Sequence, residues 1–395
     1  MHNGKLVLID PLSNEMELML LSALFDLSID QEQHLRDLTL STINWEEFLN
    51  LVIKNRVYPL VYRNLSRLKY AGIDPNVLAA LGKRCRKNQL DSLRLTTELI
   101  KIMGILDKQG IRAISVKGPL LGLALYGDIA MRTSRDLDIL VNNDDIQAAE
   151  DILLQEGYRK DPCFVSLTPR QKSYYLKKIH HLCYLKGGIE VELHWRFHEE
   201  YYDISFQEAW DNKTEFAISG RNINVLNDTE NFLYLVFHGS KHAWKRLRWL
   251  CDVREIVNRD ELDWEHILVR ARQMGITHML EQALVLLDML FQIKPPLPLK
   301  TKNEAAATRL ALMCLPFINN CDEQDGLPGH PLYLHEKRYF MIWHRSLQGK
   351  IRFLAEHYFP NMLDFEAVKF QDRYFFMYYL VRPFYKIKRI INKSS

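Results

Sequence analysis

The sequence of 395 residues is poor in cysteine and has no long apolar run. Its six cysteines are scattered without a Cys-x-x-Cys pair, which argues against a dense disulfide framework and is typical of free thiols in a reducing compartment. No stretch approaches the ~20 apolar residues needed to cross a bilayer. The first residues also lack the basic-then-apolar pattern of a signal peptide. We therefore expect a cytoplasmic protein without a transmembrane segment.

The sequence also has no large excess of charge of either sign, because it contains 52 basic and 49 acidic residues and its net charge is +3. No global field therefore favours DNA or RNA as a partner, and nucleic acid remains conceivable only through a local patch. With 47% hydrophobic and 26% charged residues, the composition is that of a folded globular protein. Its length allows a large core divided into two or three domains.

The spacing of apolar residues predicts helices over most of residues 13–106. Asn44 with Glu47 fits a capping box, so we expect one of these helices to begin at Trp45. The period then changes to that of short strands over residues 111–116, 136–141 and 189–195.

Two glycine-containing turns mark strand connections, at residues 186–188 and 219–222. The first predicts a hairpin over residues 180–195. Between the strands, residues 144–157 follow a helical pattern that ends at Gly157, which suits a C-cap. After the second turn, the pattern predicts a single helix over residues 229–257, followed by another with Asp263 as its N-cap.

These elements together predict an α+β fold, in which a small mixed β-sheet core is flanked by N-terminal and C-terminal helical regions. We expect the N-terminal helical region to span residues 1–100, the α/β core residues 101–227 and the C-terminal helical domain residues 228–395. The aromatic and basic C-terminus could touch a membrane surface or nucleic acid, but its apolar run is too short to span a bilayer, and we expect it to dock as a helix through its aromatic face.

Two carboxylates, Asp136 and Asp138, interrupt an otherwise apolar strand. Residues two apart on a strand face the same side, so they project together while Leu137 and Ile139 enter the core. Neighbouring carboxylates repel each other unless a cation lies between them, and oxygen ligands favour Mg²⁺ or Mn²⁺. A D-x-D tripeptide is common, however, and strand acids are often merely solvated.

The order of the sequence elements around Asp136 and Asp138 favours a functional site over merely solvated acids. The sequence Lys117-Gly118 forms a tight turn before an apolar helix, where backbone N–H groups and the helix dipole can bind phosphate. The hairpin strand that follows supplies a third acid, either Glu190 or Glu192.

The residues described above resemble the nucleotidyltransferase-fold superfamily, the DNA polymerase β-like proteins. The resemblance consists of a glycine turn, a helix, an alternating strand with two Asp residues and a later carboxylate. Within that superfamily, residues 116–141, 187–197 and 238–253 resemble the bacterial uncharacterised nucleotidyltransferase family, and residues 45–65 are similar to its N-terminal helical region. The resemblance extends over about residues 43–256.

The resemblance implies a role for each matching residue. It places Lys117 and Gly118 in the phosphate-binding turn and Arg132 near phosphate. It makes Asp136, Asp138 and Glu192 the catalytic metal ligands. The sequence departs from the superfamily pattern in two places. Pro119 follows the turn glycine and removes a backbone N–H donor. The third acid is Glu instead of Asp, which leaves Glu190 as an alternative to Glu192.

A basic segment follows the predicted core. Lys241 and His242 lie in the matching stretch and are expected to reach the nucleotide, although core-facing histidines beside a solvated basic stripe would look the same. His238 and His242 lack the further ligands of a zinc site. On the hairpin, His181 and His194 are expected to be structural, with His194 a reasonable partner for the carboxylates.

The resemblance therefore predicts a metal-dependent nucleotidyltransferase that moves an NMP group from an NTP to an acceptor hydroxyl, releasing pyrophosphate. ATP is the expected NTP, and the acceptor is a small molecule, sugar, peptide or protein. One alternative is a catalytically degenerate nucleotide-binding module, such as the partner half of a toxin–antitoxin pair. Another is a helical interaction protein whose sheet is only a scaffold.

Overall fold

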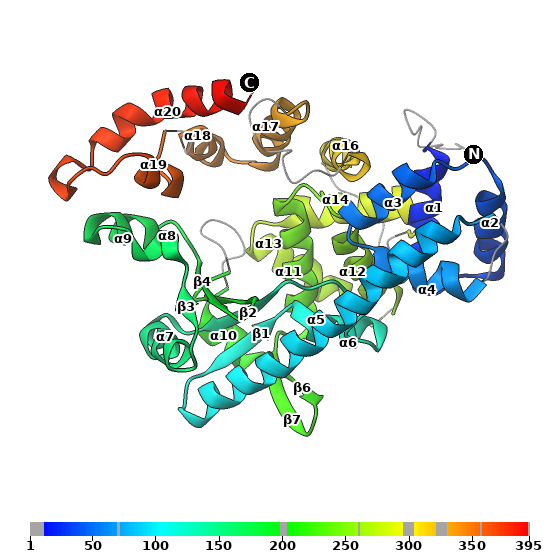
Figure 1. Cartoon of the computed structure of the whole chain (residues 1–395), viewed down its shortest axis with the longest axis horizontal. Coiled ribbons are helices and arrows are strands. Elements are labelled where there is room, and N and C mark those ends of the chain that lie inside the picture. The colour runs from blue at the N-terminus through cyan, green and yellow to red at the C-terminus, as the bar shows by residue number, and fades with distance from the viewer. Residues whose placement is uncertain are drawn as a thin grey trace. The chain divides into compact units, whose positions relative to one another are not determined.

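The computed structural model describes residues 12–68, 72–197, 204–259, 261–294, 304–320, 330–355 and 358–393. The chain has a mixed α+β fold, with helices towards both termini and strands in the middle of the sequence (Figure 1), which confirms the predicted fold class. Among the described residues, no helix is both long enough and apolar enough to span a membrane.

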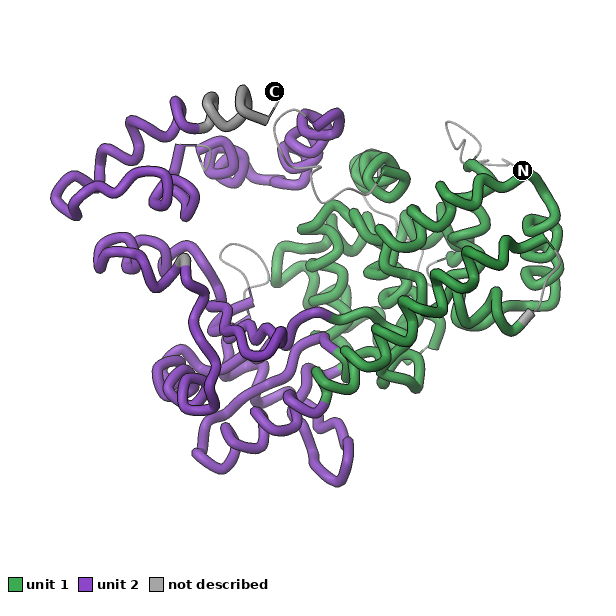
Figure 2. Tube along the Cα trace, in the orientation of Figure 1, with its two compact units in different colours: residues 1–96, 119–134, 228–322 green, residues 97–118, 135–227, 323–395 purple. Residues whose placement is uncertain are grey.

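Two compact units make up the chain, and neither is continuous in sequence (Figure 2). We call them the helical unit and the sheet unit. The helical unit contains residues 1–96, 119–134 and 228–322, and the sheet unit contains residues 97–118, 135–227 and 323–395. The boundary at residue 96 falls inside one long helix, α5 (Pro75–Lys108).

The sheet unit is built on a mixed sheet, which in the described chain has seven strands in the order β3-β4-β5-β2-β1-β7-β6. The central pair β2 and β5 is parallel, as is β1 with β7, and the other neighbours are antiparallel. The strands are β1 (Ala113–Val116), β2 (Asp136–Val141), β3 (Arg159–Lys160), β4 (His181–Lys186), β5 (Ile189–His194), β6 (Thr214–Ile218) and β7 (Arg221–Val225).

The predicted hairpin is β4 and β5, paired in antiparallel register from His181 opposite His194 to Lys186 opposite Ile189. Its two turn residues, Gly187 and Gly188, both have positive φ, as a tight hairpin turn of this twist requires. The three predicted strands and this hairpin are therefore confirmed.

Helices of the sheet unit pack on both the strands and one another. Tyr184 of β4 donates to Glu150 of α7, and Gln171 of α9 donates to Tyr378 of the C-terminal helix over 2.8 Å. The helices are the C-terminal part of α5, α7 (Ile146–Gln155), α8 (Pro162–Val165), α9 (Pro169–Leu176), α10 (Phe206–Asp211), α17 (Tyr333–Trp343), α18 (Leu347–Ala355), α19 (Met362–Ala367) and α20 (Met377–Lys393), with 3₁₀ turns η1 (Asn143–Asp145) and η2 (Asp372–Tyr374).

Two helices of the helical unit, α3 (Trp45–Lys54) and α13 (Trp264–Gln273), begin where the sequence predicts. The helices of this unit are α1 (Asn14–Ser22), α2 (Ile29–Leu40), α3 (Trp45–Lys54), α4 (Tyr58–Leu68), the first part of α5, α6 (Gly118–Tyr126), α11 (Asp228–Lys241), α12 (Leu247–Asn258), α13 (Trp264–Gln273), α14 (Thr277–Phe291), α15 (Glu304–Leu312) and α16 (Leu315–Asn319). Asn44 caps α3 and Asp263 caps α13, as expected. In a capping box the Glu47 side chain would accept a hydrogen bond from the backbone N–H of Asn44. That N–H donates instead to Glu15 over 2.7 Å.

The prediction of one helix over residues 229–257 is wrong. The chain forms α11 and α12 instead, separated by a turn in which Ala243 and Trp244 both have φ 50°. The fully buried Trp244 ring packs against Gly239, which has no side chain to block it. Burying this large ring on α11 stabilises the turn and offsets the two left-handed backbone conformations.

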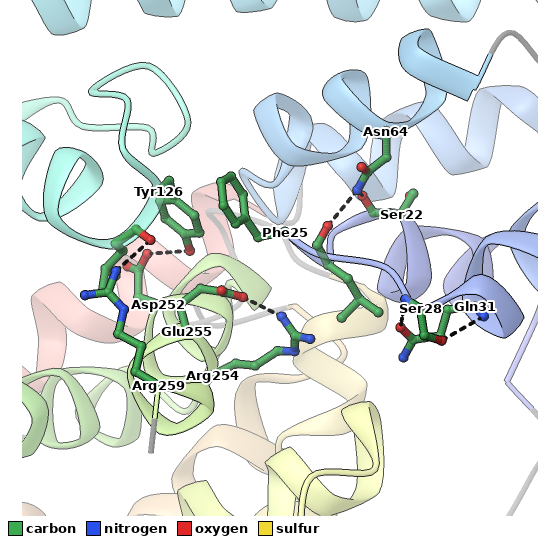
Figure 3. A network of polar contacts seen from close by, with 12 residues as sticks. Ser22, Phe25, Ser28, Gln31, Asn64, Tyr126, Asp252, Arg254, Glu255 and Arg259 are labelled. Atoms are coloured by element: carbon green, nitrogen blue, oxygen red, sulfur yellow. Dashed lines mark hydrogen bonds and ion pairs between the residues drawn. The ribbon is translucent and has the colours of Figure 1, made fainter. Parts of the chain in front are cut away.

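Buried polar bonds tie the helices of this unit together (Figure 3). The Tyr126 hydroxyl lies 3.2 Å from Asp252, and the Asn64 amide donates to the carbonyl of Ser22 over 2.9 Å. Arg259 donates to the carbonyl oxygens at the end of α6. The bonds of Tyr126 and Asn64 satisfy polar groups that would otherwise be costly to bury, whereas Arg259 is exposed.

Candidate active site on the central strands

The carboxylates occupy one face of the sheet at its centre, where β2 and β5 run side by side. The parallel register sets Asp136 opposite Glu190 and Asp138 opposite Glu192. The alternate residues of both strands, Leu137, Ile139, Val191 and Leu193, are at most 1% exposed and form the core of the other face. The same sheet therefore has an apolar face that stabilises the fold and an acidic face that gathers four carboxylates.

Lys117 lies directly against this acidic face because of the register between β1 and β2. Val116, the last residue of β1, pairs with Asp138, and the chain then turns through Lys117 (φ 57°) and Gly118 (φ 64°). The Lys117 Nζ atom lies 3.4 Å from Oδ1 of Asp138, with the two side chains 11% and 5% exposed. A lysine in the left-handed region is strained, and residues of this kind cluster at functional sites.

A second partner of the carboxylates comes from the end of β5. His194 is buried, and its Nε2 atom lies 3.1 Å from Oδ1 of Asp138 and 3.2 Å from Oε2 of Glu192. Because both partners are carboxylates, Nε2 must donate. The histidine predicted as a reasonable partner for the carboxylates thus contacts two of them directly.

The charges on this face shift one another's protonation. Burial alone would raise the pKa of Asp138, but the Lys117 ammonium and the hydrogen bond from His194 hold it well below its usual range. Burial also favours a high pKa for Glu192, but the His194 hydrogen bond and the charges of His181 and His194 together lower that pKa. For Glu190, burial and the charges of Glu192 and Asp136 raise the pKa instead. Asp138 and Glu192 are therefore held as carboxylates, ready to bind a cation.

The sheet brings further donor atoms to the same face. Because His181 pairs with His194 and Cys183 with Glu192, side chains of β4 extend the acidic row, and one ligand atom each from His181, Cys183 and Glu192 lie within 4.8 Å of one another. Sequence reasoning missed Cys183 and His180 here. Counting back from a two-residue turn at Gly187–Gly188 would have found the Cys183–Glu192 pair.

Arg132 lies in the helical unit. Its Nε atom donates to Asp252 over 2.9 Å, its guanidinium also bonds Ser134 over 3.2 Å, and its side chain is 3% exposed. Asp252 in turn accepts from Tyr126 (Figure 3). This buried network fixes Arg132 in position, and its contact with phosphate stays a prediction.

Lys241 and His242 also belong to the helical unit, so their contact with the nucleotide stays a prediction. Lys241 is the last residue of α11, and the His242 ring stacks on Trp249 with the centroids 5.1 Å apart. Because the predicted single helix breaks after Lys241, Lys245 and Arg248 do not continue its helical spacing. Arg248 instead bonds the carbonyl of Thr133.

The sequence model of a family described as uncharacterised nucleotidyltransferase matches residues 41–292, which is more than half of the chain. No curated protein matches. A solved structure of the antibiotic-resistance factor ANT(2'')-Ia matches at 16% identity and a TM-score of 0.33, covering 48% of this chain and 97% of that one. At this score the structural match carries no inference.

Proposed function

The chain belongs to the uncharacterised nucleotidyltransferase family, and from this membership we propose that it transfers an NMP group from an NTP to an acceptor hydroxyl and releases pyrophosphate. One observation carries the proposal. Asp138 and Glu192 lie opposite each other on adjacent parallel strands and beside the Lys117-Gly118 turn, and Asp136 lies two residues before Asp138 on the same strand. This is the arrangement in which carboxylates and a phosphate-binding turn act on the same substrate.

The donor set fits a divalent cation. Asp136, Asp138 and Glu192 would hold Mg²⁺ or Mn²⁺ through hard oxygen ligands, and Asp138 and Glu192 are both kept ionised. When bound, such ions supply Lewis-acid polarisation of the phosphoryl group and neutralise the attacking and leaving oxygens.

The chain's own residues bind and orient the substrate. The N–H groups at the start of α6 and the Lys117 ammonium offer positive charge to the triphosphate, and Arg132, Lys241 and His242 are proposed to contact it as well. Lys117 stands in contact with Asp138. With the charge of Asp138 balanced by a bound cation, Lys117 would be able to bind phosphate.

ATP is the proposed NTP, and the acceptor is a small molecule, sugar, peptide or protein hydroxyl. We propose that the reaction takes place in the cytoplasm, in keeping with the scattered cysteines. Incubating the protein with each NTP and a fractionated cell extract, followed by mass spectrometry of the products, would identify both substrates by the added NMP mass.

The test of the chemistry is substitution of the two strand aspartates. Asp136→Asn and Asp138→Asn should each lower Mg²⁺-dependent transfer by about 100-fold or more, because each removes charge that stabilises the transition state. Asp151→Asn, an exposed helix residue bonded to Gln147, is the matched control and should keep full activity. Full activity in either strand variant would overturn the proposal.

The Lys117–Asp138 ion pair favours one second candidate. A resident ammonium can take the place of a metal ion beside a carboxylate, as a catalytically degenerate nucleotide-binding or toxin–antitoxin-type module would need. Calorimetry separates the two functions. Metal-dependent NTP binding supports the enzyme, and its absence, with no transfer activity, supports the degenerate module.

A further inference from the structure

Three imidazole rings gather where β4 begins and β5 ends. His181 and His194 form a cross-strand pair with ring centroids 4.8 Å apart. His180 immediately precedes β4, so strand alternation does not force its side chain to the opposite face. Its ring lies 4.7 Å from that of His181 and 5.6 Å from that of His194.

The nitrogens of these rings are close enough to share a ligand. One nitrogen from each of His180, His181 and His194 lies within 4.8 Å of the other two. Zn–N bonds of about 2.0–2.1 Å set tetrahedral nitrogen ligands roughly 3.3 Å apart, so small side-chain rotations would close the cluster on an ion. Within the described part of the chain, Nδ1 of His181 is buried and has no hydrogen-bond partner. Such an orphaned acceptor or donor is costly unless a ligand satisfies it.

We propose that His180, His181 and His194 bind a borderline divalent transition-metal ion, of which Zn²⁺ is the representative, at a site separate from the oxygen ligands of the nucleotidyltransferase centre. Imidazole nitrogen favours such ions, whereas Mg²⁺ prefers oxygen, so the two donor sets select different metals. Glu192, with Oε2 3.7 Å from Nε2 of His181, is placed to orient that imidazole. The proposal does not require that the protein transfer nucleotides.

The proposal is tested by metal binding to the full chain. Zn²⁺ would be measured by equilibrium dialysis in millimolar Mg²⁺, and Co²⁺ by the visible absorption that tetrahedral nitrogen coordination produces. The wild-type protein should hold one Zn²⁺ that Mg²⁺ does not displace. His180→Ala and His181→Ala should each weaken Zn²⁺ affinity about tenfold or more and reduce the Co²⁺ absorption.

The chain offers a matched control in His238→Ala. The His238 ring lies 4.7 Å from that of His242, the same separation as His180 from His181, but in the helical unit. This variant should bind Zn²⁺ as the wild type does. The glutamine variants His180→Gln and His181→Gln, checked by circular dichroism in EDTA, separate loss of a ligand from loss of fold.

Three results would overturn the proposal: no Mg²⁺-resistant Zn²⁺ on the wild-type protein, wild-type affinity in His181→Ala, or loss of the ion in His238→Ala alone. Asp136→Asn keeps the two ideas apart. It should abolish nucleotidyl transfer and leave Zn²⁺ binding unchanged. Zn²⁺ binding without any transfer activity in the wild type would contradict the proposed function only.

Discussion

The ammonium of Lys117 lies 3.4 Å from Oδ1 of Asp138, and the two side chains are 11% and 5% exposed. The pair joins the turn after β1 to the neighbouring strand β2. Because both side chains are buried, each depends on the other to balance its charge, and Asp138 also accepts a hydrogen bond from His194.

Replacing Lys117 with methionine should destabilise the metal-free protein. Asp138 would lose its ammonium partner while staying buried, so its pKa should rise and the free energy of unfolding should fall by about 1–3 kcal/mol. Urea denaturation in EDTA measures this change. Lys117→Arg keeps the charge and should lie close to the wild type, and equal stability of Lys117→Met and wild type would show that His194 alone compensates Asp138.

Glu192 and Glu190 should differ in their effect on catalysis. Glu192→Gln should lower kcat by about 100-fold or more, since this carboxylate lies opposite Asp138 and is held ionised by His194. Glu190→Gln, on the same strand and the same face, should lower it far less. Steady-state kinetics with Mg²⁺ compare the two variants, and the reverse ranking would make Glu190 the third acid.

His181 should make the protein less stable in weak acid. Burial and the charge of His194 lower its pKa to about 4, while the unfolded value is about 6.5. Between these values the unfolded chain binds a proton here and the folded chain does not, so the free energy of unfolding falls as the pH falls from about 6.5 to 4. In His181→Gln this part of the slope should disappear.

Urea denaturation at several pH values in EDTA measures that slope. His34→Gln, which replaces an exposed histidine of the helical unit paired with Glu17, is the control and should retain the wild-type slope. A slope in His181→Gln equal to that of wild type would rule out a neutral His181 in the folded protein.

Gly239→Ala should be destabilising because an added Cβ would overlap the buried indole of Trp244. We expect a loss of about 1–3 kcal/mol, as for other overpacked cores. Gly104→Ala is the matched control, since there a Cβ meets only the flexible end of the Arg221 side chain and the helix gains up to about 1 kcal/mol. Thermal unfolding of both variants gives the comparison, and a Gly239→Ala variant as stable as Gly104→Ala would mean that the helix break tolerates repacking.

Lys241→Ala should weaken NTP binding about tenfold or more without changing the fold, because a charge-assisted bond to phosphate is lost. Calorimetric titration with a non-hydrolysable NTP and Mg²⁺ measures the affinity. Lys54→Ala is the control, since Lys54 is likewise the last residue of its helix and is exposed. Equal affinities of the two variants would remove Lys241 from the nucleotide site.

Much of the sheet unit could be predicted from local patterns. The alternation in β2 and β5 separates acidic from apolar positions, and two glycines fix the hairpin turn, because both signals act between residues close in sequence. The break between α11 and α12 could not be predicted in this way. Its cause is the burial of Trp244 against Gly239, a packing interaction that outweighs helical periodicity.

The sequence by itself therefore determined the candidate residues, which are the strand carboxylates and the Lys117-Gly118 turn, and it indicated the family to which the chain belongs. Only the tertiary structure decided which of them meet. The register of β2 with β5 joins Asp138 to Glu192, and the register of β1 with β2 carries Lys117 to Asp138. The pairing of β4 with β5 brings His181 to His194. Partners on different strands depend on register, which is fixed by the burial of whole faces and not by any one residue.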